Sequence, residues 1–523
     1  MRIPMTKETL LRIFSRRRLE SFFMGRIYPI VVAALVLCGY FMGAEFYIHF
    51  VNMALVCTAL CVCRSIRPTI IVLCSFVFQI SREHTPSNNN ITGVPSDYYF
   101  TEGRGVALVI SFAVVAAAFV YFFVRNKLIT RDTLRSLPLV IPSAILALAF
   151  VLGGAFSSVW SFGSVGYSLV QVVVWFVIFY VYLLGFKNER GSELVGYLTY
   201  AMSIVAAILL IELAEIYISA DGLYDAAGNI SRGGVIYGWG VTNTAAQALT
   251  VLIPIMFIGT VKSKHSIYYF VMATLTFLGS ILNLSRTALV VGVPIYVASL
   301  IIVFIKSNKK KIHAVEIGMS VAIIAALVLI FREYTFPAFD NYVDRGLGDS
   351  GRYEIWRNGF AAFLDAPIFG KGFFGLNDTV PGFSNAEFIP FMMHNTIVHM
   401  PACFGIFGSL AYSYYRIKTI KPFVKRPTTD KALLGLALLS VLLGSLFENF
   451  IFYILPMFSY SVVFAVCFKL VAEEREEESK VSHGSSQSSA DTALRALANP
   501  VGDTDTDEEN LPGVTPNEEL ESE

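Results

Sequence analysis

Long apolar runs dominate this chain and restrict it to one broad class of fold. A helix that crosses the roughly 30 Å hydrocarbon core of a bilayer needs about 20 residues, or somewhat fewer where its ends snorkel. Of the 523 residues, 55% are hydrophobic and only 15% are charged, a balance that excludes a string of water-soluble domains. The sequence therefore predicts an all-α polytopic membrane protein with about 12 to 14 transmembrane helices. The candidate spans are residues 28–43, 46–63, 68–80, 105–124, 139–156, 166–186, 196–218, 243–261, 267–284, 287–306, 314–331, 396–418, 432–449 and 451–471.

Positive charge collects in some of the connections between these spans. Lys and Arg are frequent in residues 125–138, 307–313 and 416–431, and ahead of the first span. Short loops rich in Lys and Arg stay in the cytoplasm. The number of spans between these basic loops is consistent with all of them on that side, and it puts both termini in the cytoplasm as well. We therefore expect a multi-pass protein of the plasma membrane whose longer loops face outward. Those outward connections are residues 81–104, 219–242 and 332–395.

The two ends of the chain differ from its apolar centre. Residues 1–27 carry three consecutive arginines before the first span and no convincing cleavage site, so we expect a basic cytoplasmic segment and a retained first helix. Residues 28–471 form the predicted transmembrane domain. Residues 472–523 hold 15 acidic and 3 basic residues and lack aromatic side chains, which predicts a disordered acidic cytoplasmic tail.

The connection 332–395 is 64 residues long and is predicted to contain structure of its own. Within it, the segment near 350–364 has helical spacing, and we expect one amphipathic face on the membrane surface. The side chains assigned to that face are Arg352, Tyr353, Trp356, Phe360 and Phe363.

Three glycines follow this helix in the same connection. Gly370, Gly372 and Gly375 match the spacing GxGxxG, but nucleotide binding through that motif requires a strand before it and a helix after it. Neither is expected in an exterior loop. The glycines therefore predict a flexible or closely packed turn, and no nucleotide site.

A histidine stands where the long connection re-enters the membrane. His394 precedes Asn395 and a span that contains Gly405 and Gly408. A histidine at the end of a span is commonly an interfacial residue. However, one that follows a structured loop and opens a helix rich in small residues is placed to face an internal cavity, and imidazole is suited to proton transfer near neutral pH.

Three arginines are predicted on the outward, less positive side. Arg286 lies between two apolar runs, and Arg232 and Arg352 lie in outward connections. Arg286 alone could extend to the headgroups. Together the three arginines predict a cationic site, and the planar fork of arginine favours phosphate.

Several of these motifs together resemble the O-antigen ligase and polysaccharide polymerase superfamily, over about residues 230–410. His394-Asn395, nine residues, Gly405, two residues and Gly408 resemble its signature. Other matching pieces are Ser285-Arg286-Thr287, the Arg352 to Trp356 segment and Phe369-Gly370-Lys371-Gly372. A weaker match runs from Arg232 to Asn243, where Val-Thr stands in place of the Pro that the family often has.

The resemblance implies a transferase that moves a glycan from an undecaprenyl-pyrophosphate carrier to a glycan or lipid-linked acceptor on the outer face. His394 would accept the proton of the attacking hydroxyl, and Arg286 and Arg352 would stabilise the leaving pyrophosphate. The residues expected to bind substrate are Arg232, Asn243, Asn395, Trp356 and Glu448. Glu448 lies near the outer end of the thirteenth span, where a partner for an arginine is an equally good interpretation.

No cofactor, metal ion or nucleic acid is expected. The seven cysteines form no CxxC pair and no metal-hydrolase motif is present, so the expected partners are the lipid-linked glycan, the acceptor and membrane lipids. The sequence does not separate a ligase from a polymerase. The alternative of a different class is a transporter or flippase of lipid-linked oligosaccharide, which would more often show broken helices in two matched halves.

Overall fold

The computed structural model describes residues 15–76, 103–158, 160–219, 230, 235, 242–307, 309–330, 332–333, 336–337, 340, 351–379, 392–424, 427–453, 457 and 459–476. It divides the chain into two units, residues 1–471 and 472–523, and describes only residues 472–476 of the second. The described elements are helices, so the protein is an all-α polytopic membrane protein, as predicted.

Most helices are joined by short turns. The elements before the middle of the chain are α2 (Arg16–Met24), α3 (Ile27–Met42), α4 (Glu45–Val62), α5 (Pro68–Phe76), α7 (Arg104–Arg125), α8 (Arg131–Arg135), α9 (Val140–Ala155), α10 (Phe162–Val172), the π-helix η1 (Val173–Val177), α11 (Ile178–Gly185) and α12 (Gly191–Ser219). Those after it are α13 (Thr242–Lys262), α14 (Ser266–Leu282), the π-helix η3 (Ala288–Gly292), α15 (Val293–Lys306), α16 (Lys310–Ile330), α18 (Arg352–Asp365), the 3-10 helix η4 (Phe374–Thr379), α19 (Thr396–Val424), α20 (Thr429–Gly444) and the 3-10 helix η5 (Phe450–Phe452). Residues 459–476 form a further helical run.

Each of the predicted spans coincides with a helix or part of one. Among the described residues, seven helices are long and apolar enough to cross a membrane alone, or eight if α2 and α3, which meet at 73°, form one span. The other predicted spans fall on helices that are shorter, interrupted or more charged. Those are α5, α9, α14, α19, α20 and residues 459–476.

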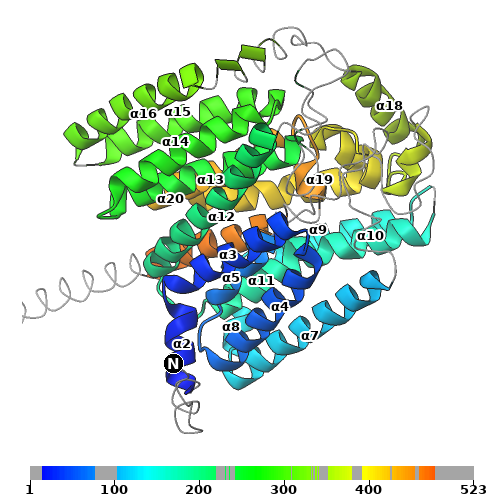
Figure 1. Cartoon of the computed structure of the whole chain (residues 1–523). Coiled ribbons are helices and arrows are strands. Elements are labelled where there is room, and N and C mark those ends of the chain that lie inside the picture. The colour runs from blue at the N-terminus through cyan, green and yellow to red at the C-terminus, as the bar shows by residue number, and fades with distance from the viewer. Residues whose placement is uncertain are drawn as a thin grey trace, which may run out of the picture. The chain divides into compact units, whose positions relative to one another are not determined.

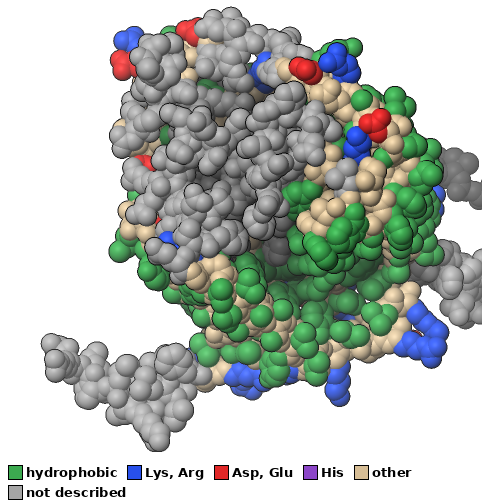
Figure 2. Space-filling model, turned by 90° about the vertical axis from the view of Figure 1, so that its right-hand side faces the viewer, with side chains coloured by type: hydrophobic (Ala, Val, Ile, Leu, Met, Phe, Trp, Pro, Cys, Tyr) green, Lys and Arg blue, Asp and Glu red, His purple; other side chains and the backbone are tan. Residues whose placement is uncertain are grey.

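Apolar side chains cover the outer surface of the helices as well as their interior. In α7, Val109, Val120 and Val124 are each more than 60% exposed, as are Val315 and Leu329 in α16. Figure 2 shows hydrophobic side chains over much of one face and Lys and Arg along its lower edge. A surface of this kind is unfavourable in water and matches a lipid environment.

Helix α13 lies among α12, α14, α15 and α20 (Figure 1). Small residues allow this close packing, because a Cβ added at Gly259 would lie 2.3 Å from the Tyr269 ring. On the opposite side, Gln247 Nε2 donates to the Ser440 carbonyl of α20 at 2.9 Å. This hydrogen bond holds the N-terminal part of α13 against the C-terminal part of α20.

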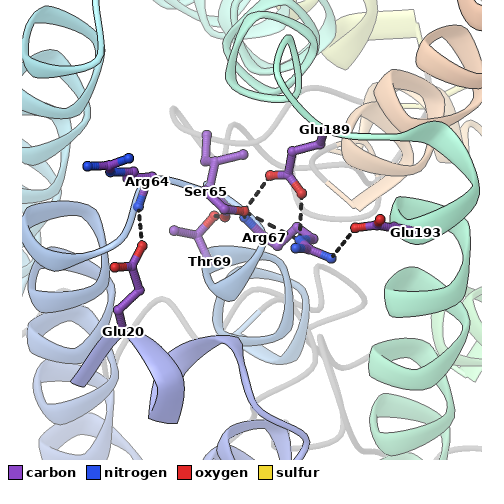
Figure 3. A network of polar contacts seen from close by, with 8 residues as sticks. Glu20, Arg64, Ser65, Arg67, Thr69, Glu189 and Glu193 are labelled. Atoms are coloured by element: carbon purple, nitrogen blue, oxygen red, sulfur yellow. Dashed lines mark hydrogen bonds and ion pairs between the residues drawn. The ribbon is translucent and has the colours of Figure 1, made fainter. Parts of the chain in front are cut away.

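A polar network ties the turns between the first helices to the start of α12 (Figure 3). Arg67 Nε lies 2.5 Å from Glu189 Oε2, and Ser65 Oγ donates to the other oxygen of that carboxylate. The Arg64 amide donates to Glu20 Oε1 of α2 at 3.1 Å. Burial raises the pKa of the Glu189 carboxyl, while the bond from Ser65 and the charge of Arg67 act against that rise.

Two predicted spans have different ends in the structure. The span 432–449 is helical only to Gly444, after which residues 445–449 turn away from the helix axis. The span 451–471 overlaps η5 at its start, and residues 457 and 459–471 are helical, whereas residues 454–456 and 458 lie outside the described residues. The turn of residues 445–449 carries Glu448, which is the centre of the candidate site.

Candidate functional site

Glu448 is a buried carboxylate in the turn that follows α20. Its side chain is 5% exposed. The Glu448 amide donates to the Gly444 carbonyl at 2.9 Å, which anchors the turn to the last residue of the helix. A buried carboxylate is stable only when it is paired and hydrogen-bonded, so its partners define the site.

Three side chains from distant parts of the chain meet at this carboxylate. Glu448 Oε1 accepts hydrogen bonds from Arg352 Nη2 at 3.0 Å and from Asn243 Nδ2 at 2.5 Å. His394 Nδ1 lies 2.5 Å from Glu448 Oε2. The structure thus brings together four of the residues predicted from the sequence.

The backbone holds His394 in an unusual conformation just before α19. Its backbone angle φ is 50°, in the left-handed region that residues other than glycine rarely adopt. Such a conformation costs about 1–3 kcal/mol and persists where the surrounding structure enforces it. The Thr396 amide supplies one such constraint, because it donates to the Ser445 carbonyl at 2.9 Å and so joins the start of α19 to the turn that carries Glu448.

His394 and Arg352 are open to the outside while Glu448 is not. The His394 side chain is 32% exposed and that of Arg352 is 21% exposed. The imidazole and the guanidinium therefore form the accessible layer, and the carboxylate lies beneath them. With Nδ1 facing Glu448, Nε2 is the ring nitrogen that points away from the carboxylate.

Helix α18 presents Arg352 from its first turn. A Cβ added at Gly359 would lie 2.5 Å from the Val398 side chain, so α18 packs closely on α19. The position of this helix confirms the prediction for residues 350–364, and the placement of its apolar face on the membrane surface stays a prediction. Tyr353 is 71% exposed and Phe360 is 51% exposed, because the side of α18 that contains Gly359 packs against the protein.

Asn243 extends the network toward the turn between α14 and η3. Ser285 Oγ donates to Asn243 Oδ1 at 2.7 Å, and both residues are buried. Arg286 follows directly and is half-buried, so its backbone lies beside the network. Arg232 lies outside the described residues. Sequence reasoning did not single out the Ser285 hydroxyl as the link between Asn243 and this turn.

Asn395 and Trp356 occupy positions around the histidine and the arginine. Asn395 Oδ1 accepts from the Ile397 amide at 2.8 Å and caps the start of α19, so this oxygen already has a structural use. Trp356 is half-buried, and its Nε1 has no acceptor among the described residues. Asn449, which sequence reasoning missed, is buried beside Glu448, and neither polar atom of its side chain has a partner in the described part of the chain.

The glycine motifs fold against each other below the site. Helix α19 breaks at Gly405, where φ is 61° and ψ is −159°. The turn of Gly370 and Gly372 fits into this break, because the Gly372 amide donates to the Cys403 carbonyl at 3.0 Å and the Ile406 amide donates to the Pro367 carbonyl at 2.8 Å. The prediction of a flexible or closely packed turn is therefore resolved in favour of close packing.

The described residues contain no group of three or more His, Cys, Asp or Glu side chains that is arranged to hold a metal ion. The ionisable groups that meet in the site are instead one carboxylate, one guanidinium and one imidazole. This combination provides a base that a carboxylate orients, beside a cation able to bind phosphate.

A comparison with protein families supports the resemblance found in the motifs. Residues 270–413 match the O-antigen ligase family, which confirms the predicted superfamily. The matched residues include Arg286, Arg352 and His394, whereas Asn243 and Glu448 lie outside them. No curated protein matches the chain. The family match and the apolar helices together indicate a multi-pass membrane protein with a function like that of a glycosyltransferase.

Proposed function

We propose that this protein transfers a glycan from an undecaprenyl-pyrophosphate carrier to an acceptor hydroxyl at the outer face of the membrane. The observation that carries the proposal is the contact of Glu448 with both His394 and Arg352. A base, the carboxylate that orients it and a phosphate-binding cation are then within one network. The predicted topology supports the outer face, because the basic loops lie at the other ends of the spans.

In the proposed reaction, His394 Nδ1 donates to Glu448 and leaves Nε2 as the proton acceptor. The acceptor sugar hydroxyl gives its proton to Nε2 while its oxygen bonds to the anomeric carbon of the donor. The bond from that carbon to the pyrophosphate oxygen breaks, and the electron pair leaves with the pyrophosphate. Base catalysis of this kind contributes about 10² to 10⁴ in rate.

Arginine supplies the positive charge for the leaving group. Arg352 uses Nη2 to reach Glu448, and we assign its other N–H groups to the pyrophosphate. We place Arg286 in the same role, because it directly follows Ser285 of the network. Charges that are fixed before the reaction stabilise the transition state without a reorganisation cost. On this model, activity does not depend on a divalent metal ion.

The remaining predicted residues take supporting roles in the proposal. We assign Glu448 to positioning rather than to substrate binding, because both of its oxygens are already in contact with protein groups. Asn243 holds Glu448 in turn. The Nε1 group of Trp356 and the side chain of Asn395 remain candidates for contacts to the glycan, and Arg232 for contacts to the pyrophosphate.

The experiment measures donor consumption in proteoliposomes that contain lipid-pyrophosphate-linked glycan, with either a second lipid-linked glycan or a lipid A core as the acceptor. The His394→Ala variant should transfer glycan about 10² to 10⁴ times more slowly and still bind the donor. The His265→Ala variant is the matched control, because His265 is exposed at the opposite end of α14 from Ser285, and it should be as active as the wild type.

The same preparations test the transporter alternative. Movement of a fluorescent lipid-linked glycan across the bilayer is followed in parallel with donor consumption. Wild-type transfer by His394→Ala would contradict the proposal. Movement of the lipid without any transfer to either acceptor would favour a flippase.

A further inference from the structure

Arg416 is a buried cation in the last third of α19, far from the candidate site. Its side chain lies over three aromatic rings, with Trp175 at 5.0 Å, Tyr412 at 4.9 Å and Tyr415 at 5.6 Å from ring centroid to guanidinium carbon. The residue is only 8% exposed. In the part of the chain that the structure describes, no Asp or Glu forms an ion pair with it.

The hydrogen bonds of Arg416 are also incomplete. Nη1 donates to the Tyr460 hydroxyl at 3.3 Å, whereas Nε and Nη2 have no acceptor among the described residues. Aromatic rings stabilise a guanidinium but do not replace an anion, and an uncompensated charge inside a membrane protein is unfavourable. An anion bound to Nε and Nη2 would satisfy both the charge and the free donors.

A cavity of about 260 Å³ borders Arg416 between α15, α19, α20 and residues 459–471. Its lining includes a second cation, Lys431, and contains no acidic residue. The neighbouring Asp430 is paired with Lys262 instead. Most of the remaining wall is apolar. It includes Ile302, Phe423, Leu438, Leu439, Leu442 and Phe464.

We propose that this cavity binds the phosphate of an anionic membrane lipid, with the headgroup at Arg416 and the acyl chains along the apolar wall. A lipid fits better than free phosphate, because the lining holds two cations, Arg416 and Lys431, and is otherwise mostly hydrocarbon. Ile420, Val424 and Leu439 belong to the lining and are also exposed, so the apolar wall of the cavity continues to the outer surface of the protein. The planar fork of Arg416 offers two adjacent donors to one phosphate.

The position along α19 separates this lipid site from the proposed donor site. Thr396 lies beside His394, and Arg416 is 20 residues further along the helix, or about 30 Å at 1.5 Å per residue if the break is ignored. The predicted topology puts residues 416–431 on the cytoplasmic side. The lipid is therefore one of the cytoplasmic leaflet and not the glycan donor.

The test is lipid binding to the full chain in detergent, measured by native mass spectrometry with added phosphatidylglycerol or phosphatidylcholine. We expect the wild type to retain phosphatidylglycerol selectively. Arg416→Gln should weaken that binding by about 10- to 100-fold, the range for a hydrogen bond to a charged group. Lys418→Gln is the matched control, because Lys418 is exposed on the same helix, and it should bind like the wild type.

A second variant and a competition measurement test the proposal even if Arg416→Gln fails to fold. Gly435→Leu retains Arg416 but fills the cavity, since a Cβ at Gly435 would already lie 3.5 Å from Phe423, and it should also lose the lipid. Inorganic phosphate is added to protein that holds phosphatidylglycerol. If phosphate displaced the bound lipid as well as added phosphatidylglycerol does, the ligand of the cavity would be a soluble anion and the proposal would be overturned. Equal retention of phosphatidylglycerol by the wild type and by folded Gly435→Leu would also overturn it.

Discussion

Replacing Glu448 with glutamine removes the charge at the centre of the site and leaves its size nearly unchanged. The carboxylate accepts hydrogen bonds on Oε1 from Arg352 and Asn243, and its Oε2 lies 2.5 Å from His394 Nδ1. An amide has one oxygen and one NH₂ group in place of two acceptor oxygens. Glutamine can therefore satisfy one side of this arrangement but not both.

Each orientation of the amide removes a different function. If the NH₂ group faces His394, then Nδ1 must accept, the proton moves to Nε2, and Nε2 can no longer act as the base. If the NH₂ group faces Arg352 and Asn243, donors point at donors. Hydrogen bonds to charged groups contribute about 1.5–3 kcal/mol each. Replacing the carboxylate behind a catalytic histidine by an amide lowers kcat by as much as about 10⁴. We expect transfer by Glu448→Gln to fall by about 10² to 10⁴.

The measurement is donor consumption in proteoliposomes, together with thermal unfolding and donor binding on the same protein. Glu354→Gln makes the same chemical change at a carboxylate that is 65% exposed and contacts only Arg357, at 3.9 Å, among the described residues. That control should keep wild-type activity. A Glu448→Gln protein that unfolds like the wild type and transfers glycan within about threefold of its rate would refute the orienting role of Glu448.

Other predictions concern the cationic part of the site. Arg352→Lys keeps the charge but loses the planar fork, so transfer should fall at least about tenfold with the protein still inserted, and an unchanged rate would remove Arg352 from the mechanism. Ser285→Ala removes the hydrogen bond to Asn243 and should lower the free energy of unfolding by about 1–3 kcal/mol in a thermal or denaturant assay, whereas no shift would show that this bond does not support the network. Donor consumption should survive EDTA, because guanidinium groups hold the pyrophosphate; activity that returns only with added Mg²⁺ or Mn²⁺ would contradict this assignment.

The helices were largely predictable because each depends on a local property. Apolar length alone places α7 at Arg104–Arg125 against a predicted span of 105–124, and α13 at Thr242–Lys262 against 243–261. The end of α20 was not predictable in this way. Residues 445–449 contain no glycine or proline that would end the helix, and the Ser445 carbonyl in this turn accepts from the Thr396 amide of another helix.

The residues of the candidate site could be named from the sequence, but their contacts with one another could not. Motif spacing singled out His394, Arg352 and Asn243, yet Glu448 is separated from them by 54, 96 and 205 positions along the chain. Nothing local to Glu448 distinguishes a partner of His394 from a carboxylate at the edge of the bilayer. The packing of α13, α18, α19 and α20 brings these side chains together.

The break in α19 explains why glycine is required in the two motifs, and it leads to a further prediction. At φ 61° and ψ −159°, Gly405 has a conformation that is closed to alanine. A Cβ there would also lie 2.2 Å from the Ile368 carbonyl oxygen. Gly370 meets the same segment from the other side, with its added Cβ 2.3 Å from the Cys403 carbonyl carbon. Two backbones in direct contact leave no side chain that can move aside.

Gly405→Ala should therefore be strongly destabilising. Backbone strain of about 1–3 kcal/mol and overpacking of about 1–3 kcal/mol together predict a loss of about 2–6 kcal/mol in the free energy of unfolding. Gly318→Ala is the control, because Gly318 lies within α16 with nothing near its added Cβ, and it should be neutral or slightly stabilising. Since the first part of α19 also places His394, transfer should fall with stability in Gly405→Ala. A Gly405→Ala protein with the unfolding midpoint and transfer rate of the wild type would show that the two glycine motifs do not depend on this contact.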